Sequence, residues 1–297
     1  MTKSPDVQEL IVVTGASSGI GAATAQEMAR RGYHVLAGVR REQDARDIQG
    51  PNIEPVLIDI THPDDIAALA QRIDTDPPGR ALRAVVNNAG IGTNAPVEVF
   101  DLDAWRKLFE VNYFGHIAVT QKLLPALLRS KGRVINISSV GGRIAMATYG
   151  PYAGAKFALE ALSDSLRREL APSGVDVVVI EPGAVQTKIS GRAIAVANNV
   201  AAAMTPEQTE RYGALIHAVT AQAAAADKTG AKASVAANVV VRAITSRRPR
   251  TRYGVGREAA LLGLMSLLPD KVIDWLLTAV LRRYLPKAGA EEAKPLS

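Results

Sequence analysis

Tyr152 and Lys156, near the middle of the chain, have side chains that together could exchange a proton with a substrate. Residues four apart on a helix share a face, so the phenol and the ammonium can point into one site, close to Ser139 at the end of the preceding apolar run. An unperturbed phenol has a pKa of about 10, and an adjacent cation lowers that value. The pattern predicts a proton donor, a cation that tunes its pKa and a hydroxyl that anchors a carbonyl oxygen.

A glycine-rich segment, residues 14–21, follows directly after the apolar run 10–13. An alanine-rich helix to Arg31 and a second strand over 33–39 are expected next. Glycine at a strand-to-helix turn lets a pyrophosphate approach the helix N-terminus, where free N–H groups favour anions. This βαβ spacing favours a dinucleotide site over a merely structural turn. The residues expected at the cofactor are Gly15, Ser17, Ser18, Gly19, Ile20 and Gly21.

The end of the second strand indicates which dinucleotide is bound. Sites that prefer NAD place an acidic residue there against the ribose hydroxyl, whereas NADP sites offer a cation to the 2′-phosphate. Val39 is followed by Arg40 and Arg41, with no acid. NADP(H) is therefore expected rather than NAD(H). The alternative is that both arginines are solvated charges at the start of a loop.

Further apolar runs predict the remaining strands, over residues 53–60, 83–86, 133–138 and 175–180, with a possible edge strand over 252–255. The runs lack polar alternation and are separated by helical segments. This arrangement is typical of a doubly wound, mostly parallel α/β sheet, in which both faces of each strand are buried. Such sheets bind ligands at the carboxyl ends of their strands. The residues expected there are Asp59 and Ile60 at the adenine, and Asn88, Ala89 and Gly90 at the ring and ribose.

Asn112 lies among apolar residues in the middle of a predicted helix, residues 103–128. A buried amide is costly unless its hydrogen bonds are satisfied. Asn112 therefore either makes a hydrogen bond within the core or holds water beside Lys156.

The composition argues against several other functions. The 297 residues include no cysteine, and the four histidines are far apart in the sequence, so no metal site is expected. The formal charge of +6 hints at anionic partners, but aromatic residues make up only 4% of the chain, which argues against nucleic acid. Residues 1–10 resemble neither a signal peptide nor a spanning segment, so a cytoplasmic protein is expected.

The end of the chain has a different character. Residues 192–236 are alanine-rich and without predicted strands, and a helical lid is expected over about 188–236. Residues 257–297 form an extension whose helices have wide apolar faces. These helices are too short and too charged to span a bilayer, which requires about 20 apolar residues. Three interpretations stay open: packing on this domain or a second subunit, a cover for a hydrophobic pocket, or a peripheral membrane contact through residues 259–283.

These motifs together resemble the short-chain dehydrogenase/reductase family over roughly residues 8–256. The matching motifs are the glycine-rich segment, Asn87-Asn88-Ala89-Gly90, Asn112, Ser139, Tyr152 with Lys156, and Pro182-Gly183 with Thr187. The resemblance implies a Rossmann fold in which Tyr152 is the general acid or base at the substrate oxygen. Lys156 would lower the Tyr152 pKa and hold the nicotinamide ribose, Ser139 would bond the carbonyl, and Asn112 would continue a proton relay.

The resemblance also distinguishes the site residues from their neighbours. The family's usual Ser-to-Tyr spacing favours Ser139 over Ser138, and Tyr152, unlike Tyr149, has a lysine four residues on. The further cofactor residues that the resemblance implies are Pro182, Gly183, Val185 and Thr187.

We therefore expect one catalytic domain, residues 1–256, with a cofactor half at about 8–136 and a catalytic and substrate half at about 137–256. The hypothesis is hydride transfer between NADP(H) and a hydrophobic ketone or secondary alcohol, as in family members that act on steroids and retinoids. The alternatives are a reductase of fatty acyl or polyketide-like oxo groups, and a nucleotide-binding redox sensor without catalysis. The resemblance implies a homodimer or homotetramer, assembled through helices at about 103–128 and 152–171.

Overall fold

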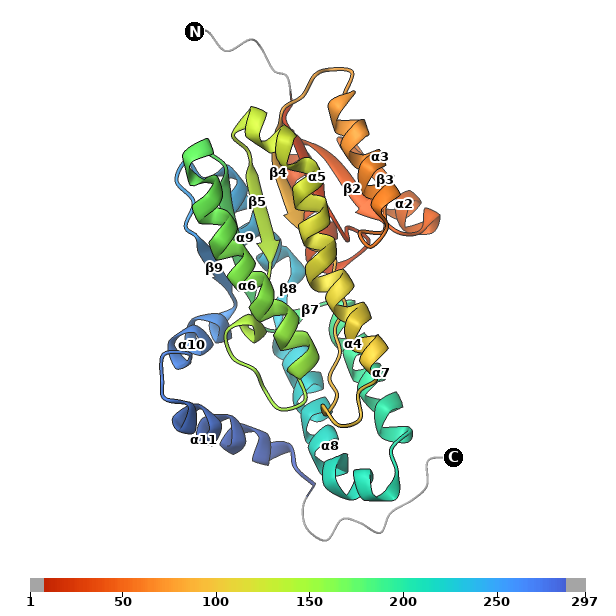
Figure 1. The fold of residues 1–297 in the computed structure, drawn as a ribbon, viewed down its shortest axis with the longest axis vertical. Coiled ribbons are helices and arrows are strands. Elements are labelled where there is room, and N and C mark those ends of the chain that lie inside the picture. Colours follow the sequence, from red (N-terminus) through yellow and green to blue (C-terminus); the bar gives the residue numbers. More distant parts are fainter. Residues whose placement is uncertain (1–7, 287–297) are drawn as a thin grey trace.

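Seven short strands form one sheet at the centre of the computed structural model, which describes residues 8–286 (Figure 1). Every pair of neighbouring strands is parallel. The second and third strands in the sequence lie on one side of the first strand, and the later strands of this sheet lie on its other side. The predicted doubly wound sheet is confirmed. In spatial order the strands are β3 (Ile53–Leu57), β2 (His34–Val39), β1 (Leu10–Val13), β4 (Leu82–Asn87), β5 (Arg133–Ile137), β6 (Asp176–Pro182) and β9 (Arg252–Val255).

Helices cover both faces of this sheet, and successive side chains of a strand point to opposite faces. In β1, Ile11 and Val13 pack with one helical layer, whereas Leu10 and Val12 pack with the other. All four side chains are at most 1% exposed, which explains why the strand contains no polar residue. The first layer contains α1 (Gly19–Arg30), α2 (Glu42–Ile48) and α9 (Ala233–Thr245); the second contains α3 (Pro63–Asp74), α5 (Gly115–Ser130) and α6 (Gly150–Leu170).

The predicted helix over 103–128 is interrupted in the structure. It consists of α4 (Leu102–Phe109), a π-helical turn (Glu110–Phe114) and α5, with Asn112 in the π-helical turn. Such turns occur mostly as single irregularities within helices and frequently at functional sites. The third predicted strand, 53–60, is also shorter than expected, because it ends at Leu57.

The expectation of a strand-free segment over 192–236 is wrong at one point. After α7 (Lys188–Ala202) and α8 (Pro206–Thr229), the short strand β8 (Ala231–Lys232) pairs with β7 (Val185–Gln186). The next helix, α9, packs on α1 in the core layer. Its alanines conceal this role in the sequence, because small residues suit both an exposed helix and close packing against another helix.

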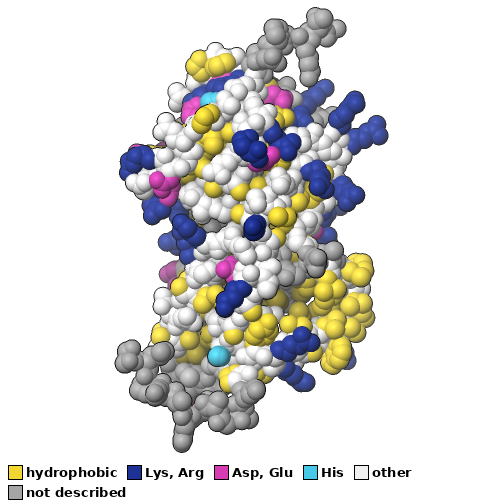
Figure 2. Space-filling model, turned by 180° about the vertical axis from the view of Figure 1, so that it is seen from behind, with side chains coloured by type: hydrophobic (Ala, Val, Ile, Leu, Met, Phe, Trp, Pro, Cys, Tyr) yellow, Lys and Arg dark blue, Asp and Glu magenta, His cyan; other side chains and the backbone are white. Residues whose placement is uncertain are grey.

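The extension begins with α10 (Arg257–Met265) and α11 (Asp270–Leu281), which lie to one side of the sheet below β9 (Figure 1). α11 has no buried residue. Among the residues that the structure describes, no helix is long and apolar enough to cross a membrane. We call the exposed large side chains of this region the C-terminal apolar patch, which Figure 2 shows at the lower right: Leu261, Leu264, Leu267, Leu268, Val272, Trp275, Val280 and Leu285.

Candidate active site

The glycines of the turn between β1 and α1 allow two backbone segments to touch. Gly15 has a φ of +66°, and a Cβ at this position would lie 2.7 Å from the Cα of Ala89. A Cβ on Gly21 would lie 2.4 Å from the amide nitrogen of Asn88. A larger residue at either position would push the segment after β4 away from the turn.

The N-terminus of α1 is open at this turn. Its N-cap, Ser18, makes no side-chain cap hydrogen bond, so the N–H groups of the first turn have no capping acceptor. Ser17 is exposed, and Gly19 and Ile20 are partly exposed. A Cβ on Gly19 would lie 2.9 Å from the Thr187 side chain, which places the segment after β6 against this turn. An open helix end beside a glycine cradle fits the pyrophosphate of a dinucleotide.

Thr14 and Asn88 tie the carboxyl ends of β1 and β4 together. Thr14 Oγ1 accepts hydrogen bonds from the N–H groups of Asn88 (3.0 Å) and Ala89 (3.1 Å). The Asn88 amide donates to the carbonyl oxygens of Thr14 (2.9 Å) and Gly15 (3.0 Å). The Asn88 side chain thus shapes the turn, while Ala89 and Gly90 beside it stay partly exposed. Thr14 belongs to the glycine-rich segment, but the sequence-based predictions did not name it among the site residues.

Asn112 and His116 hold the backbone that follows β4. Asn112 accepts a hydrogen bond from the Ile91 N–H and donates one to the Ile91 carbonyl, both at 2.8 Å. His116 Nε2 lies 2.7 Å from the Ala89 carbonyl oxygen. Burial, with the charge of Lys156, lowers the pKa of His116 to about 3, so the ring is neutral and Nε2–H donates.

The Asn112 amide therefore makes hydrogen bonds within the core, the first of its two predicted roles, and the proton relay stays a prediction. His116 was missed by the sequence-based predictions. Its position four residues after Asn112 was the available signal, because residues four apart share a helix face.

The two arginines after β2 have different surroundings. Arg41 donates to the Asp44 carboxylate through Nε (2.7 Å) and Nη2 (2.5 Å). Arg40 is 61% exposed in its side chain, with Nη1 3.9 Å from Asp59. Asp59 in turn accepts hydrogen bonds from the N–H (3.0 Å) and hydroxyl (2.7 Å) of Thr61. Of the two arginines, Arg40 has the longer contact with its acidic partner.

Several predicted cofactor residues at the other strand ends are more buried than expected. Ile60 is 4% exposed, and Pro182 and Val185 are also buried. The N–H of Gly183 donates to the Val255 carbonyl at 3.0 Å, which joins β6 to the edge strand. Ile60, Pro182 and Val185 are therefore packed into the protein at the strand ends. The Thr187 side chain, in contrast, lies against the turn at Gly19.

Ser139, Tyr152 and Lys156 come together at the carboxyl end of β5. A Cβ added to Gly141 would lie 3.4 Å from Ser139 Oγ and 3.5 Å from the Tyr152 ring, and a hydrogen bond joins Ser139 and Tyr152. Lys156 Nζ lies 5.9 Å from the centroid of the Tyr152 ring and donates to the Ile137 carbonyl at 2.8 Å. The helical spacing and the strand end thus place the three groups as the sequence suggested.

The protonation of this group differs from the expectation. Burial raises the pKa of the Tyr152 phenol, and the hydrogen bond with Ser139 opposes that rise. Burial also lowers the pKa of Lys156 to about 8, against the charge of Glu160. The sequence predicts a lowered pKa for Tyr152, whereas the pKa of the buried phenol is raised, because burial disfavours the phenolate. The phenol is therefore protonated at neutral pH, and the ammonium is still largely charged at pH 7.

The neighbouring serine and tyrosine have surroundings of their own. The Ser138 hydroxyl faces Gly142, where an added Cβ would lie 2.8 Å from it. Burial raises the pKa of Tyr149, and a hydrogen bond with Asn94 opposes that rise. Tyr149 is thus held by the segment after β4 rather than placed beside a lysine.

Helices α7 and α8 rest on the segment that follows β4. A Cβ on Gly92 would lie 3.1 Å from the Ile189 side chain on α7. Glu98 accepts hydrogen bonds from Arg211 (2.6 Å) and from the hydroxyl of Tyr212 (2.8 Å), both on α8. This segment begins at the predicted cofactor residues, so the two helices are tied to a wall of the site.

The fold and these residues together define a dinucleotide-binding α/β protein. A family model described as short chain dehydrogenase matches residues 9–198. The chain belongs to this family, whose members bind NAD or NADP. Its similarity to retinol dehydrogenases agrees with the resemblance found in the sequence.

Three individual proteins illustrate the likeness. Retinol dehydrogenase 5 of Mus musculus is 36% identical over 289 residues, which cover 94% of this chain and 91% of that protein. The structure of a short chain dehydrogenase from Burkholderia cenocepacia in complex with NADP is 26% identical, with a TM-score of 0.70 and coverage of 91% of this chain and 97% of the other. A family member from Burkholderia phymatum in complex with NAD has a TM-score of 0.74, covers 98% of both chains and, at 21% identity, shows the fold alone.

Proposed function

We propose that the protein transfers a hydride between NADP(H) and a hydrophobic ketone or secondary alcohol. The observation that carries this proposal is the convergence of Ser139, Tyr152 and Lys156 at the end of β5, on the same sheet edge as the glycine cradle. The nicotinamide, when bound, supplies or accepts the hydride. The remaining requirement is a positioned proton donor for the substrate oxygen, which this chain provides.

The proton is handled by the Tyr152 phenol. With its pKa raised by burial, the phenol is protonated at neutral pH and can donate to an oxygen that gains negative charge during reduction. Ser139 is placed to hydrogen-bond the same oxygen. In the oxidative direction, the Lys156 ammonium near the ring stabilises the phenolate that must form.

The preference for NADP(H) rests on Arg40. This side chain follows β2, is largely exposed and has no acidic residue before it at Val39. A guanidinium in that place can make charge-assisted hydrogen bonds to a 2′-phosphate. Asp59, 3.9 Å from the guanidinium, partly offsets its charge.

The hydrophobic substrate class is supported by the similarity to a retinol dehydrogenase and by the helices tied to the segment after β4. We propose that α7 and α8 form a lid that supplies the apolar wall. Reduction of acyl or polyketide-like oxo groups would use the same residues and is the second candidate. A sensor without catalysis is disfavoured, because it has no use for a positioned phenol and lysine.

We also propose a homo-oligomer assembled through α5 and α6. Phe114, the last residue of the π-helical turn before α5, is 49% exposed, and Phe157, on α6, is 43% exposed. Exposed aromatic side chains on neighbouring helices are typical of interfaces.

The C-terminal apolar patch is proposed to rest on an anionic membrane surface. Trp275, 68% exposed, is the type of residue that settles at a lipid interface. Lys271, Arg282 and Arg283 are exposed beside the patch and outnumber the exposed Asp270 and Asp274. The chain as a whole carries +6, so an anionic surface complements its charge. α11 is too short to span, which leaves it to lie along the surface.

Replacing Tyr152 by Phe tests the catalytic proposal. The change removes the phenolic hydroxyl and keeps the ring, so we expect kcat to fall by roughly a hundredfold or more. The affinity for NADPH, measured by fluorescence titration, should change little. Tyr149→Phe is the matched control, because it removes the same group from a tyrosine bonded to Asn94 and should retain activity. Full activity of Tyr152→Phe against a panel of steroid, retinoid and acyl carbonyls would contradict the assignment.

A further inference from the structure

Glu160, one helical turn after Lys156 on α6, is a buried carboxyl group with no part in the proposed chemistry. It is 7% exposed. Burial raises the pKa of its carboxyl group and the nearby charge of Glu181 adds to that rise, whereas a hydrogen bond with Ser138 and the charge of Arg252 oppose it. Burying an acidic group is costly unless a partner compensates for the lost hydration. Its position directly below the site therefore needs an explanation.

Arg252 on β9 forms an ion pair with this carboxyl group. Its Nε lies 3.1 Å from Glu160 Oε2 and 3.4 Å from Glu181 Oε1, and its Nη2 lies 3.0 Å from Asp164 Oδ1. Glu160 and Asp164 belong to α6, and Glu181 belongs to β6. One guanidinium therefore ties α6 to the last two strands of the sheet.

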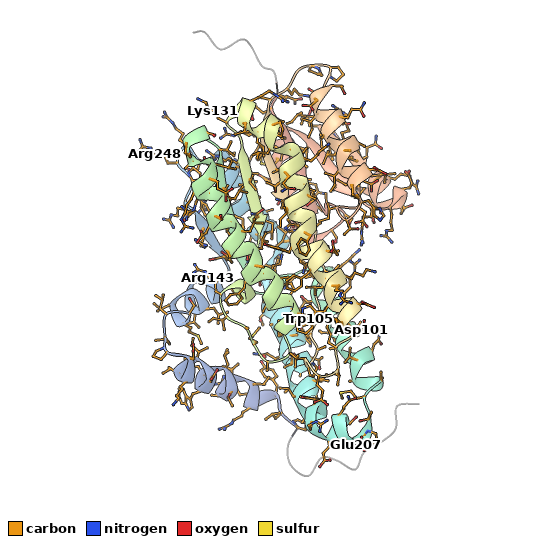
Figure 3. All side chains as sticks on the ribbon, viewed as in Figure 1. Asp101, Trp105, Lys131, Arg143, Glu207 and Arg248 are labelled. Carbon is orange, nitrogen blue, oxygen red and sulfur yellow. The ribbon has the colours of Figure 1, made fainter. Side chains whose placement is uncertain are left out.

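The same network reaches the turn that carries Ser139. Arg143, at the end of this turn, donates through Nε to Glu181 Oε1 at 2.8 Å. A Cβ on Gly142 would lie 3.1 Å from Glu160 Cγ, so the turn also packs directly on the buried carboxyl side chain. Figure 3 shows Arg143 beside α10, next to the start of the extension. The turn is thus fixed from α6 and from β6.

Glu160 also acts on Lys156. The two residues are four apart and share a face of α6. Burial lowers the pKa of Lys156 to about 8, and the negative charge of Glu160 works against that lowering. Without this carboxylate the ammonium would lose its proton at a lower pH.

We propose that Glu160 is a positioning residue, which keeps Lys156 charged and, together with Arg252, fixes the turn that carries Ser139. The inference rests on the proposed function, since it assigns Glu160 a role in serving that site. The charged groups around Glu160 are Lys156 and Asp164 on its own helix, Glu181 on β6 and Arg252 on β9, with Arg143 completing the network. The other titratable neighbours of Lys156 are Tyr152 on the same helix and His116 on α5.

The test is the pH profile of kcat/KM for Glu160→Gln, which removes the charge and keeps the shape. The ammonium is charged below the pKa of Lys156, and losing a neighbouring negative charge lowers that pKa. The alkaline fall in activity should therefore begin at lower pH, with a loss of roughly threefold at pH 8 and little change at pH 6.5. Glu160→Asp, which keeps the charge, should restore the wild-type profile.

Asp164→Asn is the matched control. It removes another carboxylate from Arg252, one turn further from Lys156, so it should lower the melting temperature without moving the pH profile. An unmoved profile for Glu160→Gln, with a similar fall in melting temperature, would overturn the role towards Lys156. Tyr152→Phe tests the proposed catalytic function independently. Full activity of that variant would show that the proposed function itself is wrong, whatever the result for Glu160→Gln.

Arg143→Gln tests the turn without disturbing the buried carboxyl group, because the Arg143 side chain is 38% exposed. We expect a higher KM for the carbonyl substrate, with the pH profile unchanged. A KM equal to that of the wild type would overturn the part of the proposal that concerns the turn.

Discussion

β1 and α11 are both rich in large apolar residues, yet their surroundings are opposite. Every side chain of β1 is buried between two helical layers, whereas α11 buries none. β1 ends at the glycine cradle, so its burial also fixes the cofactor turn. α11 contacts α8 and the short helical turn Arg282–Tyr284, which follows α11 in the chain. The comparison shows that the neighbours of an apolar segment decide whether it supports a core or is left for a partner.

Among the changes that test this comparison, the largest effect should follow from breaking the close backbone approach at the turn after β1. Gly15→Ala places a Cβ 2.7 Å from the Ala89 backbone at a φ of +66°, so we expect NADPH affinity to fall by roughly tenfold or more. Gly32→Ala is the matched control, because Gly32 also has a positive φ of +87° but nothing within 4 Å of an added Cβ. Isothermal titration with NADPH compares them. Equal affinities would mean that the turn is not the cofactor cradle.

A smaller effect is expected at Arg40, which tests the proposed preference for NADP(H) over NAD(H). Arg40→Ala should weaken NADPH binding by roughly tenfold while leaving NADH nearly unchanged, because a charge-assisted hydrogen bond contributes about 1.5–3 kcal/mol. Arg41→Ala is the control, since that guanidinium is already paired with Asp44. The measurement is the ratio of the two dissociation constants. An unchanged ratio in Arg40→Ala would remove the argument for NADP(H).

The smallest effect on the folded protein is expected in the extension. Replacing Leu264, Leu267 and Trp275 together by Ser should abolish co-sedimentation with vesicles that contain anionic phosphatidylserine. The stability should change by about 0.5 kcal/mol or less per site, because the three side chains are already exposed. Leu57→Ser, at a 47% exposed position on β3, is the control. Retained vesicle binding, or a change in oligomer mass instead, would contradict the membrane proposal.

Much of the fold could be predicted because its signals are local. The uninterrupted apolar strands gave the parallel sheet, and the edge strand at residues 252–255 was found although it is short. Irregular elements could not be found in this way. Asn112, in the π-helical turn, hydrogen-bonds the backbone of Ile91, which is distant in sequence and becomes a partner only in the folded chain.

The candidate site shows the same division. Spacing alone brought Tyr152 and Lys156 to one face of a helix, because helix geometry is fixed by the backbone. The burial that raises the Tyr152 pKa depends on every element packed around the phenol, so the expected lowering did not follow from the spacing. The choice between Arg40 and Arg41 likewise required the position of Asp44.

The amino-acid sequence by itself determined the sheet, the glycine-rich turn and the family, since each follows from hydrophobic pattern and from motifs within a few residues. Only the tertiary structure decided what lies beneath and beside the site. Glu160 looks in the sequence like an ordinary helix acid, and its buried network with Arg252 joins residues far apart along the chain. Burial and long-range pairing arise when the elements pack, which is why the local pattern did not contain them.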